Sequence, residues 1–353
     1  AYQDMIYIRD GVSITIQNCT IDGIDGAGSC TPIEFQSIDG ALIENNYIRG
    51  KCVGEGNPDG ILIRPWNNMK NIIIKNNEII MDGTGGDGIH LQMESTIYDT
   101  PIFMDNCGPI LIENNNFHDL GTKKMGVILI SGSKDVTIRY NKFHGIIGTG
   151  CGVYVSGCGD AYDIDGSAGG PYYYWVENIQ IYYNTFYLTS PAYENWAGMT
   201  KLLDTDCNPL SKNNVIYNNT YWANGSYPEW QRGIFFQGDT GIAWTIKNNI
   251  LIGLTMAIDG GSSANIDKNC FYNNQSNITT GTNPILSDPK FVNPSTGDFH
   301  LQSTSPAIDK AIDWGQTRDF DGNPKQGLSW DIGAYEFLQT CPQPIANFIM
   351  NII

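Results

Sequence analysis

The stretches NIIIKNNEI (71–79) and ILIENNNF (110–117) share one pattern: an apolar residue, any residue, Ile, any two residues, Asn, any residue and a second apolar residue. The pattern occurs nine times, and its Ile is Ile16, Ile43, Ile74, Ile112, Ile138, Ile181, Ile216, Ile246 or Ile266. Three residues after this Ile stands an Asn in every copy except the first, which has Cys19. A pattern repeated in one register indicates stacked structural repeats, each packed against its neighbours.

The chemistry of the repeat predicts a coil of β-strands. Alternating apolar residues around the Ile would bury one side of a short strand. Asn tolerates the left-handed backbone of a bend and can hydrogen-bond its copy in the next repeat, which gives a ladder of amides. A second strand recurs between the copies, at 31–36, 59–64, 87–92, 126–131, 151–156, 200–205 and 232–237 and, less regularly, at 256–261. We therefore predict an all-β fold, a right-handed parallel β-helix (solenoid) with at least two strands per turn, long aromatic loops and a C-terminal cap.

The repeat fades near residue 275, and the sequence divides into a β-helix (1–287), a C-terminal cap (288–338) and a linker with the start of a truncated domain (339–353). The motifs SPAID and DIGAYEF in the second part resemble a terminal module common behind secreted β-helices of bacteria and archaea. That resemblance implies a cap that closes the open end of the coil and uses its acidic residues structurally. The residues CPQPIANF (341–348) resemble the first strand of a PKD-type immunoglobulin-like domain.

The charge balance excludes some partners. With 20 Lys and Arg against 37 Asp and Glu, the 353-residue chain has a net charge of −17. This argues against nucleic acid, because phosphate binding needs clustered cations. No apolar run is long enough for membrane insertion. Asn-x-Ser/Thr sites and nine Cys are compatible with an extracellular or cell-surface protein, and the sequence leaves the disulfide pairing and the oligomeric state open.

The longest insertions predict a binding groove. They lie at 93–108 and 157–177, after the second strand, and at 187–199 and 222–231, before it. Insertions in these places would flank one face of the coil from both sides. We expect them to wall a groove over the second strands, because ligands usually bind in concave surfaces.

Aromatic residues are concentrated in these insertions, and aromatic faces suit a polysaccharide because sugar rings stack on them. They cluster in PYYYW (171–175), PAYENW (191–196) and YWANGSYPEW (221–230). The residues that we expect to bind the sugar chain are Tyr173, Trp175, Trp196, Trp222 and Trp230, joined by Arg64, Gln92, Tyr154 and Arg232 from the second strands. The alternative is that these rings only pack the loops onto the coil.

Two kinds of cleavage chemistry remain open. A hydrolase needs two carboxylates, and Asp204 and Asp206, which share one side of a strand, are candidates together with Asp87. A lyase needs a cation at the uronate carboxylate and a base for the C5 proton, for which His90 and Lys201 are candidates beside Arg64 and Tyr154. Asp87 also precedes a Gly, so the alternative for it is a position in a turn.

The segment DAYDIDG (160–166) is a candidate for a Ca²⁺ site, formed by Asp160, Asp163 and Asp165. Its spacing differs from that of an EF-hand, so an ordinary acidic loop is the alternative. The Cys spacing contains no paired CxxC motifs, which argues against structural zinc. Ca²⁺ is therefore the one cofactor that the sequence suggests.

The Asn-laddered coil, the Tyr- and Trp-rich loops, the DIGAYEF motif and the PKD-like start resemble the disaggregatase-related surface proteins of methanogenic archaea, and more broadly the pectate-lyase-like β-helices. The resemblance covers roughly residues 1–337 and implies action on a uronate-containing matrix polysaccharide, but it carries no catalytic motif. Our first hypothesis is an extracellular enzyme, a hydrolase or lyase, that cleaves an acidic or amino-sugar polysaccharide within its chain. The alternative is a non-catalytic glycan-binding or structural module of the cell surface.

Overall fold

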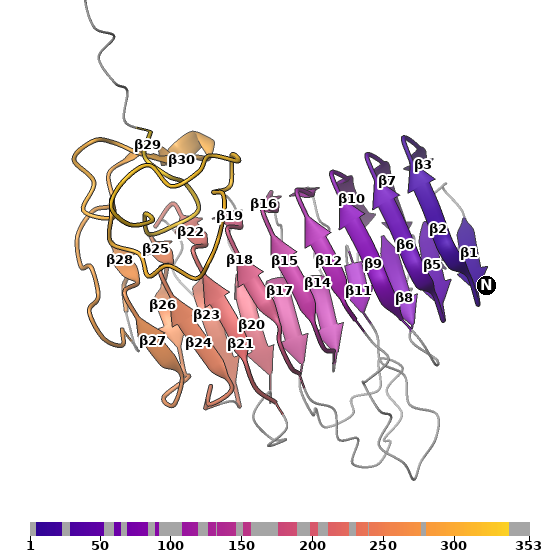
Figure 1. The fold of residues 1–353 in the computed structure, drawn as a ribbon, viewed down its shortest axis with the longest axis horizontal. Coiled ribbons are helices and arrows are strands. Elements are labelled where there is room, and N and C mark those ends of the chain that lie inside the picture. Colours follow the sequence, from indigo (N-terminus) through magenta and orange to yellow (C-terminus); the bar gives the residue numbers. More distant parts are fainter. Residues whose placement is uncertain are drawn as a thin grey trace, which may run out of the picture.

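The computed structural model describes residues 5–22, 29–52, 60–64, 69–83, 89–91, 108–118, 126–131, 133–145, 151–156, 176–188, 198–203, 211–225, 231–238, 240–276 and 280–338. Within them the chain winds into a coil, and each turn adds one strand to each of three sheets (Figure 1). We call one such turn a rung. Rung 1 holds β1, β2 and β3, and rung 9 holds β26, β27 and β28.

The three sheets are long stacks of short parallel strands. Sheet A holds β1 (Ile6–Arg9), β5 (Ile33–Gln36), β8 (Ile61–Arg64), β11 (Ile89–Leu91), β14 (Gly126–Ser131), β17 (Cys151–Ser156), β20 (Thr200–Leu203), β23 (Arg232–Gln237) and β26 (Met256–Asp259). Sheet B holds β2 (Val12–Gln17), β6 (Asp39–Glu44), β9 (Lys70–Lys75), β12 (Ile110–Glu113), β15 (Val136–Arg139), β18 (Gln180–Tyr182), β21 (Asn214–Tyr217), β24 (Trp244–Lys247) and β27 (Asn265–Asp267). Sheet C holds β3 (Thr20–Asp22), β7 (Tyr47–Cys52), β10 (Glu78–Gly83), β13 (Asn116–His118), β16 (Lys142–His144), β19 (Thr185–Leu188), β22 (Thr220–Ala223), β25 (Ile250–Ile252) and β28 (Cys270–Tyr272), with β4 (Ser29–Cys30) antiparallel to β7.

The nine Ile of the repeat form one column inside the coil, as the sequence predicts. Each is paired in register with the next along sheet B, from Ile16 opposite Ile43 to Ile246 opposite Ile266. None of the nine is more than 8% exposed. The predicted parallel β-helix is therefore confirmed, and the predicted second strands form sheet A.

A third strand follows the Asn, or Cys19 in the first rung, and an inward residue of this strand completes the core. In the middle of the coil this residue is aromatic, and the rings stack from rung to rung. The centroid distance is 4.9 Å between Phe117 and Phe143, and 4.6 Å both between Phe143 and Phe186 and between Phe186 and Tyr221. Stacked apolar side chains of this kind fill the interior without polar groups that need partners.

The predicted Asn ladder runs along the corner between sheets B and C. From Asn46 to Asn269, each side-chain Nδ2 donates to the Oδ1 of the Asn in the following rung at 3.0–3.1 Å. The same Oδ1 also accepts the backbone N–H of the preceding Asn. The left-handed backbone lies one residue earlier than we expected, at positions such as Asn45, Tyr140 and Tyr183.

The C-terminal segment packs on the side of the coil, whereas its sequence motifs predict a cap over the open end of the coil. The segment contains β29 (Phe291–Asn293), the 3₁₀ helix η2 (Pro294–Thr296) and β30 (Asp298–Leu301). Its apolar residues, among them Phe299, Trp330 and Ile332, form a second core with the outside of sheets B and C and the corner between them. The residues of the coil in this core include Tyr140, Tyr183, Tyr217, Trp222 and Ile250. The amide Nδ2 of Asn218 donates to the carbonyl oxygens of Asp331 and Gly333, at 2.8 and 3.1 Å. The end of the coil is instead extended by single bridges that residues 276, 282 and 285 form with rung 9.

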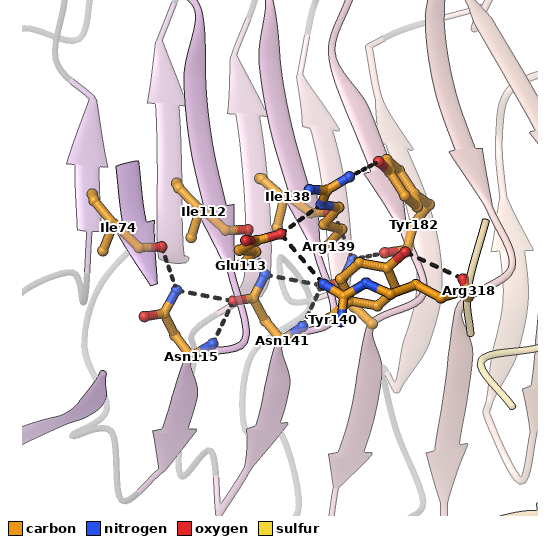
Figure 2. A network of polar contacts seen from close by, with 11 residues as sticks. Ile74, Ile112, Glu113, Asn115, Ile138, Arg139, Tyr140, Asn141, Tyr182 and Arg318 are labelled. Carbon is orange, nitrogen blue, oxygen red and sulfur yellow. Dashed lines mark hydrogen bonds and ion pairs between the residues drawn. The ribbon is translucent and has the colours of Figure 1, made fainter. Parts of the chain in front are cut away.

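A charged network joins this segment to three successive rungs (Figure 2). Glu113 accepts the Nε–H of Arg139 at 2.8 Å, and Arg139 donates through Nη1 to the hydroxyl of Tyr182 at 3.0 Å. Arg318, from the C-terminal segment, lies 3.7 Å from Glu113 and places its guanidinium 4.1 Å from the ring centroid of Tyr140. These contacts hold the segment in place through charge and a cation–π interaction.

Replacing Arg318 by Ala should destabilise the docked segment by about 1 kcal/mol, because these contacts are partly exposed to solvent. The measurement is urea unfolding together with limited proteolysis of the C-terminal segment. Lys325→Ala is the control, because Lys325 is similarly exposed and its ion pair with Asp313 is loose, at 4.0 Å. Equal stability of the two variants would contradict the prediction.

Buried carboxyl groups hold the backbone of the C-terminal segment. Glu336 accepts the N–H of Asp331 at 2.7 Å, and Asp331 accepts the N–H of Phe337 at 2.6 Å. Burial raises the pKa of Asp331 to about 6 and that of Glu336 to about 8. His300 lies between Asp321 and Asp298, whose carboxylates raise its pKa to about 9.

The stability of this segment should fall as the pH rises from 5 to about 9. A raised pKa means that the folded state binds the proton more tightly, so the stabilisation is present at low pH and disappears as each group loses its proton. We expect the free energy of unfolding to fall by more than about 1.4 kcal/mol, which corresponds to a shift of one pKa unit. The measurement is the urea midpoint as a function of pH. Glu336→Gln should flatten the profile, and an unchanged profile would argue against the titration of this group.

Candidate functional site

Four neighbouring strands of sheet A carry a cluster of polar and aromatic residues on their outer face. Tyr154 of β17 is opposite Lys201 of β20, Lys201 is opposite Phe235 of β23, and Phe235 is opposite Asp259 of β26. Their strand neighbours, such as Val153 and Leu202, are fully buried in the core, so strand alternation places the cluster on the outside.

Lys201 is held against an aromatic ring. Its Nζ lies 4.6 Å from the ring centroid of Tyr154, and the whole residue is 8% exposed. Burial lowers the pKa of the Lys201 amine; Cys151 acts in the opposite direction, and the nearby Arg232 cation lowers it further. A lysine whose pKa is lowered is neutral more often near physiological pH, and a neutral amine can accept a proton.

Arg232 forms a buried ion pair beside this lysine. Its Nε lies 2.5 Å from Oδ2 of Asp259, and its guanidinium lies 4.1 Å from the ring centroid of Phe235. The Arg232 side chain is 5% exposed and that of Asp259 21%. A desolvated guanidinium in a fixed orientation is suited to bind a carboxylate or a sugar hydroxyl.

Two side-chain amide atoms, one just before β23 and one at its end, lack a hydrogen-bond partner. The Nε2 of Gln231 and the Oε1 of Gln237 are buried and have no hydrogen bond in the structure. Gln231 directly precedes β23, and Gln237 is its last residue. Buried polar atoms normally have partners, and an unpaired pair of amides beside a charged cluster is typical of a place where water or a ligand binds.

The structure changes the interpretation of two predicted sugar-binding residues. Trp222 belongs to sheet C, is 9% exposed, and stacks on Tyr187 at 5.0 Å under the C-terminal segment. Trp222 is therefore not part of the sheet A face, and the prediction that it lines the groove is wrong. Tyr154 is on the predicted face but only 3% exposed, so it supports Lys201 and offers no open ring to a sugar.

His90 lies farther along the same column. Its backbone in β11 is opposite Leu62 and Leu129, which places it three strands from Lys201. Three strand spacings amount to roughly 14 Å. His90 and Lys201 are thus not brought together around one bond. For Arg64 the structure likewise describes the backbone, in β8, opposite Gln36.

Most of the other predicted site residues lie outside the described residues. They are Asp87, Gln92, Asp160, Asp163, Asp165, Tyr173, Trp175, Trp196, Asp204, Asp206 and Trp230. Their catalytic, sugar-binding and Ca²⁺-binding roles remain predictions. In the part of the chain that the structure describes, no group of three or more His, Cys, Asp or Glu side chains could hold a metal ion.

Sequence reasoning missed Phe235 and Asp259, which complete the cluster around Arg232. The signal was present in the repeat: Asp259 occupies the same position of its strand as Phe235 and Lys201 do in theirs. A cavity of about 130 Å³ lies elsewhere, at the corner between sheets C and A, and is lined by residues such as Gly225, Thr255 and Asn273. It has room for about four water molecules and not for a sugar chain. No helix among the described residues is long and apolar enough to cross a membrane.

A coil of three parallel sheets with an Ile core and an Asn ladder defines the class of parallel β-helix proteins. The family model described as "Right handed beta helix region" matches residues 2–186 and 99–271. The chain therefore belongs to this family of right-handed β-helices.

One solved structure shows the same fold. It is the catalytic unit of a thermostable GH87 alpha-1,3-glucanase from Streptomyces thermodiastaticus strain HF3-3, with a TM-score of 0.50 and 16% sequence identity. The alignment covers 81% of this chain and 47% of that one, so the chain spans about half the length of the glucanase unit. At this identity the similarity is one of fold. No curated protein matched the sequence.

Proposed function

We propose that this protein is an extracellular or cell-surface enzyme that degrades a polysaccharide by cutting within the sugar chain, at the outer face of sheet A. The observation that carries the proposal is the Lys201–Tyr154 pair next to the Arg232–Asp259 pair on adjacent strands. The buried guanidinium of Arg232, in a chain of net charge −17, favours an anionic ligand. We infer an acidic or amino-sugar glycan of a cell surface or matrix, as the disaggregatase-like sequence features imply.

A lyase reaction fits the groups in the cluster. Arg232 would bind the uronate carboxylate and make the C5 proton more acidic. The neutral amine of Lys201 would accept that proton while the C4–O glycosidic bond breaks and a C4=C5 double bond forms. The leaving oxygen would take its proton from the protonated lysine, which restores the neutral amine.

A hydrolase reaction is the second candidate, because the GH87 neighbour is a glucanase and shares this fold. It would use Asp204 and Asp206, which follow β20 directly in the sequence. One carboxyl group would protonate the glycosidic oxygen, and the other would activate water or attack the sugar.

The test is incubation of the full chain with chondroitin, polygalacturonate and α-1,3-glucan. Both reactions release new reducing ends, and a lyase in addition produces the ultraviolet absorbance of an unsaturated uronate. Reducing ends without this absorbance indicate hydrolysis. Binding without any cleavage would favour the non-catalytic glycan-binding role. The absence of both binding and cleavage would overturn the proposal.

A further inference from the structure

A second cluster lies on the outer face of sheet A, at the N-terminal end of the coil. Tyr7 of β1 is opposite Glu34 of β5, in the same outward column that leads through Tyr154 to Lys201. In the order of sheet A, β1 and β20 are six strand spacings apart. This corresponds to roughly 29 Å along the coil.

A chain of hydrogen bonds holds the ring of Tyr7 in one orientation. The Tyr7 hydroxyl donates to Oε1 of Gln36 at 2.7 Å, and Nε2 of Gln36 donates to Oε1 of Glu34 at 2.8 Å. Gln36 and Glu34 are 8% and 7% exposed, although both lie on the outer face, whereas Tyr7 is 48% exposed. The ring is therefore fixed at its backbone end and at its hydroxyl end, and much of its surface is open to solvent.

A fixed and half-exposed aromatic ring is a ready stacking surface. A flexible side chain loses rotamer freedom when a ligand binds, and a ring that is already held in place avoids most of this cost. The apolar face of a pyranose ring can pack on it, as in other aromatic contacts.

We propose that Tyr7, held by Gln36 and Glu34, is a distal subsite for the polysaccharide that binds at Lys201, and that it takes a sugar ring by stacking on the ring's apolar face. The inference rests on the proposed function, because it assumes that a glycan follows the outer face of sheet A. Sheet A then has a charged cluster around Lys201 and Arg232 and an aromatic stacking surface at Tyr7. Only sugar chains long enough to span six strand spacings reach both.

The experiment compares the binding of chondroitin fragments of different length, because chondroitin alternates a uronate with an N-acetylated amino sugar. The full chain is titrated calorimetrically with a tetrasaccharide and with a dodecasaccharide. A neutral α-1,3-glucan fragment and a de-acetylated, cationic chondroitin fragment of equal length separate neutral from amino sugars. The variants are Tyr7→Ala and Tyr7→Phe, with Tyr272→Ala as the control, because Tyr272 is 41% exposed on the outer face of sheet C.

We expect Tyr7→Ala to weaken dodecasaccharide binding about five-fold and to leave tetrasaccharide binding unchanged. Tyr7→Phe keeps the ring but loses the hydrogen bond to Gln36, so its loss should be smaller, about two-fold. Tyr272→Ala should bind like the wild type. Circular dichroism and the urea midpoint check that each variant is folded.

The outcomes separate the distal subsite from the enzymatic function. If the wild type binds both fragments equally well, or if Tyr7→Ala weakens both equally, the distal subsite is overturned while cleavage can still stand. If length-dependent binding is lost in Tyr7→Ala but no glycan is cleaved, the subsite stands and the enzymatic proposal fails. If the wild type binds none of these fragments, both proposals are overturned.

Discussion

Replacement of Lys201 by Ala is expected to lower the rate of polysaccharide cleavage by about 10²–10⁴-fold, the usual contribution of a positioned general base. The reason is the geometry of β20: the amine is held 4.6 Å from the Tyr154 ring centroid, and burial lowers its pKa. The measurement is the initial rate of formation of reducing ends and of unsaturated uronate. Since the base is the neutral amine, the wild-type rate should rise with pH and level off below the ordinary pKa of a lysine.

Lys201→Arg distinguishes a base from a simple cation. Arg keeps the positive charge but does not give up its proton in proteins, so it cannot serve as the base. We expect this variant to retain binding and to lose cleavage. Lys142→Ala, which removes an exposed lysine of sheet C, is the control and should remain active. If Lys201→Arg cleaves as fast as the wild type, the lysine acts only through its charge.

Replacement of Asn184 by Ala should destabilise the coil by about 3 kcal/mol or more. The amide Nδ2 of Asn184 donates to the carbonyl oxygen of Ile138 at 2.9 Å and to Oδ1 of Asn219 at 3.0 Å. Its Oδ1 accepts both the backbone N–H and the Nδ2 of Asn141. Ala would leave these buried groups of both neighbouring rungs without partners, and each unpaired group costs about 1–3 kcal/mol. The measurement is the free energy of unfolding from urea titration.

Asn265→Ala is the matched control for the ladder, because Asn265 is an exposed Asn on strand β27 of sheet B. Its loss should change the free energy of unfolding by less than about 0.5 kcal/mol. If Asn184→Ala is as stable as this control, the buried amides do not contribute to the stability of the coil.

The sequence alone was enough to predict the coil because its signal is repeated. Ile43, Ile74 and their copies recur at one position, and Asn46, Asn77 and their copies recur three residues later. The third strand escaped prediction because it is as short as three residues, as in β13, with one inward residue, Phe117. Alternation cannot be recognised in so short a segment. The left-handed backbone was predicted at the ladder Asn but lies at the residue before it. Two adjacent Asn often occur at this corner, and both favour bends.

The sequence by itself determined which residues face outward on sheet A, since strand alternation is a local property. Only the tertiary structure decided which of them meet. Lys201 lies over Tyr154 and Arg232 pairs with Asp259, although 47 and 27 residues separate the partners in the chain. These separations depend on the lengths of the insertions. The length of an insertion does not reveal which residues of neighbouring rungs will face each other. The same holds for the C-terminal segment: its motifs indicate a compact module, but only the packing of Trp330 and Ile332 on the outer surface of the coil shows that it lies on the flank, where it covers Trp222.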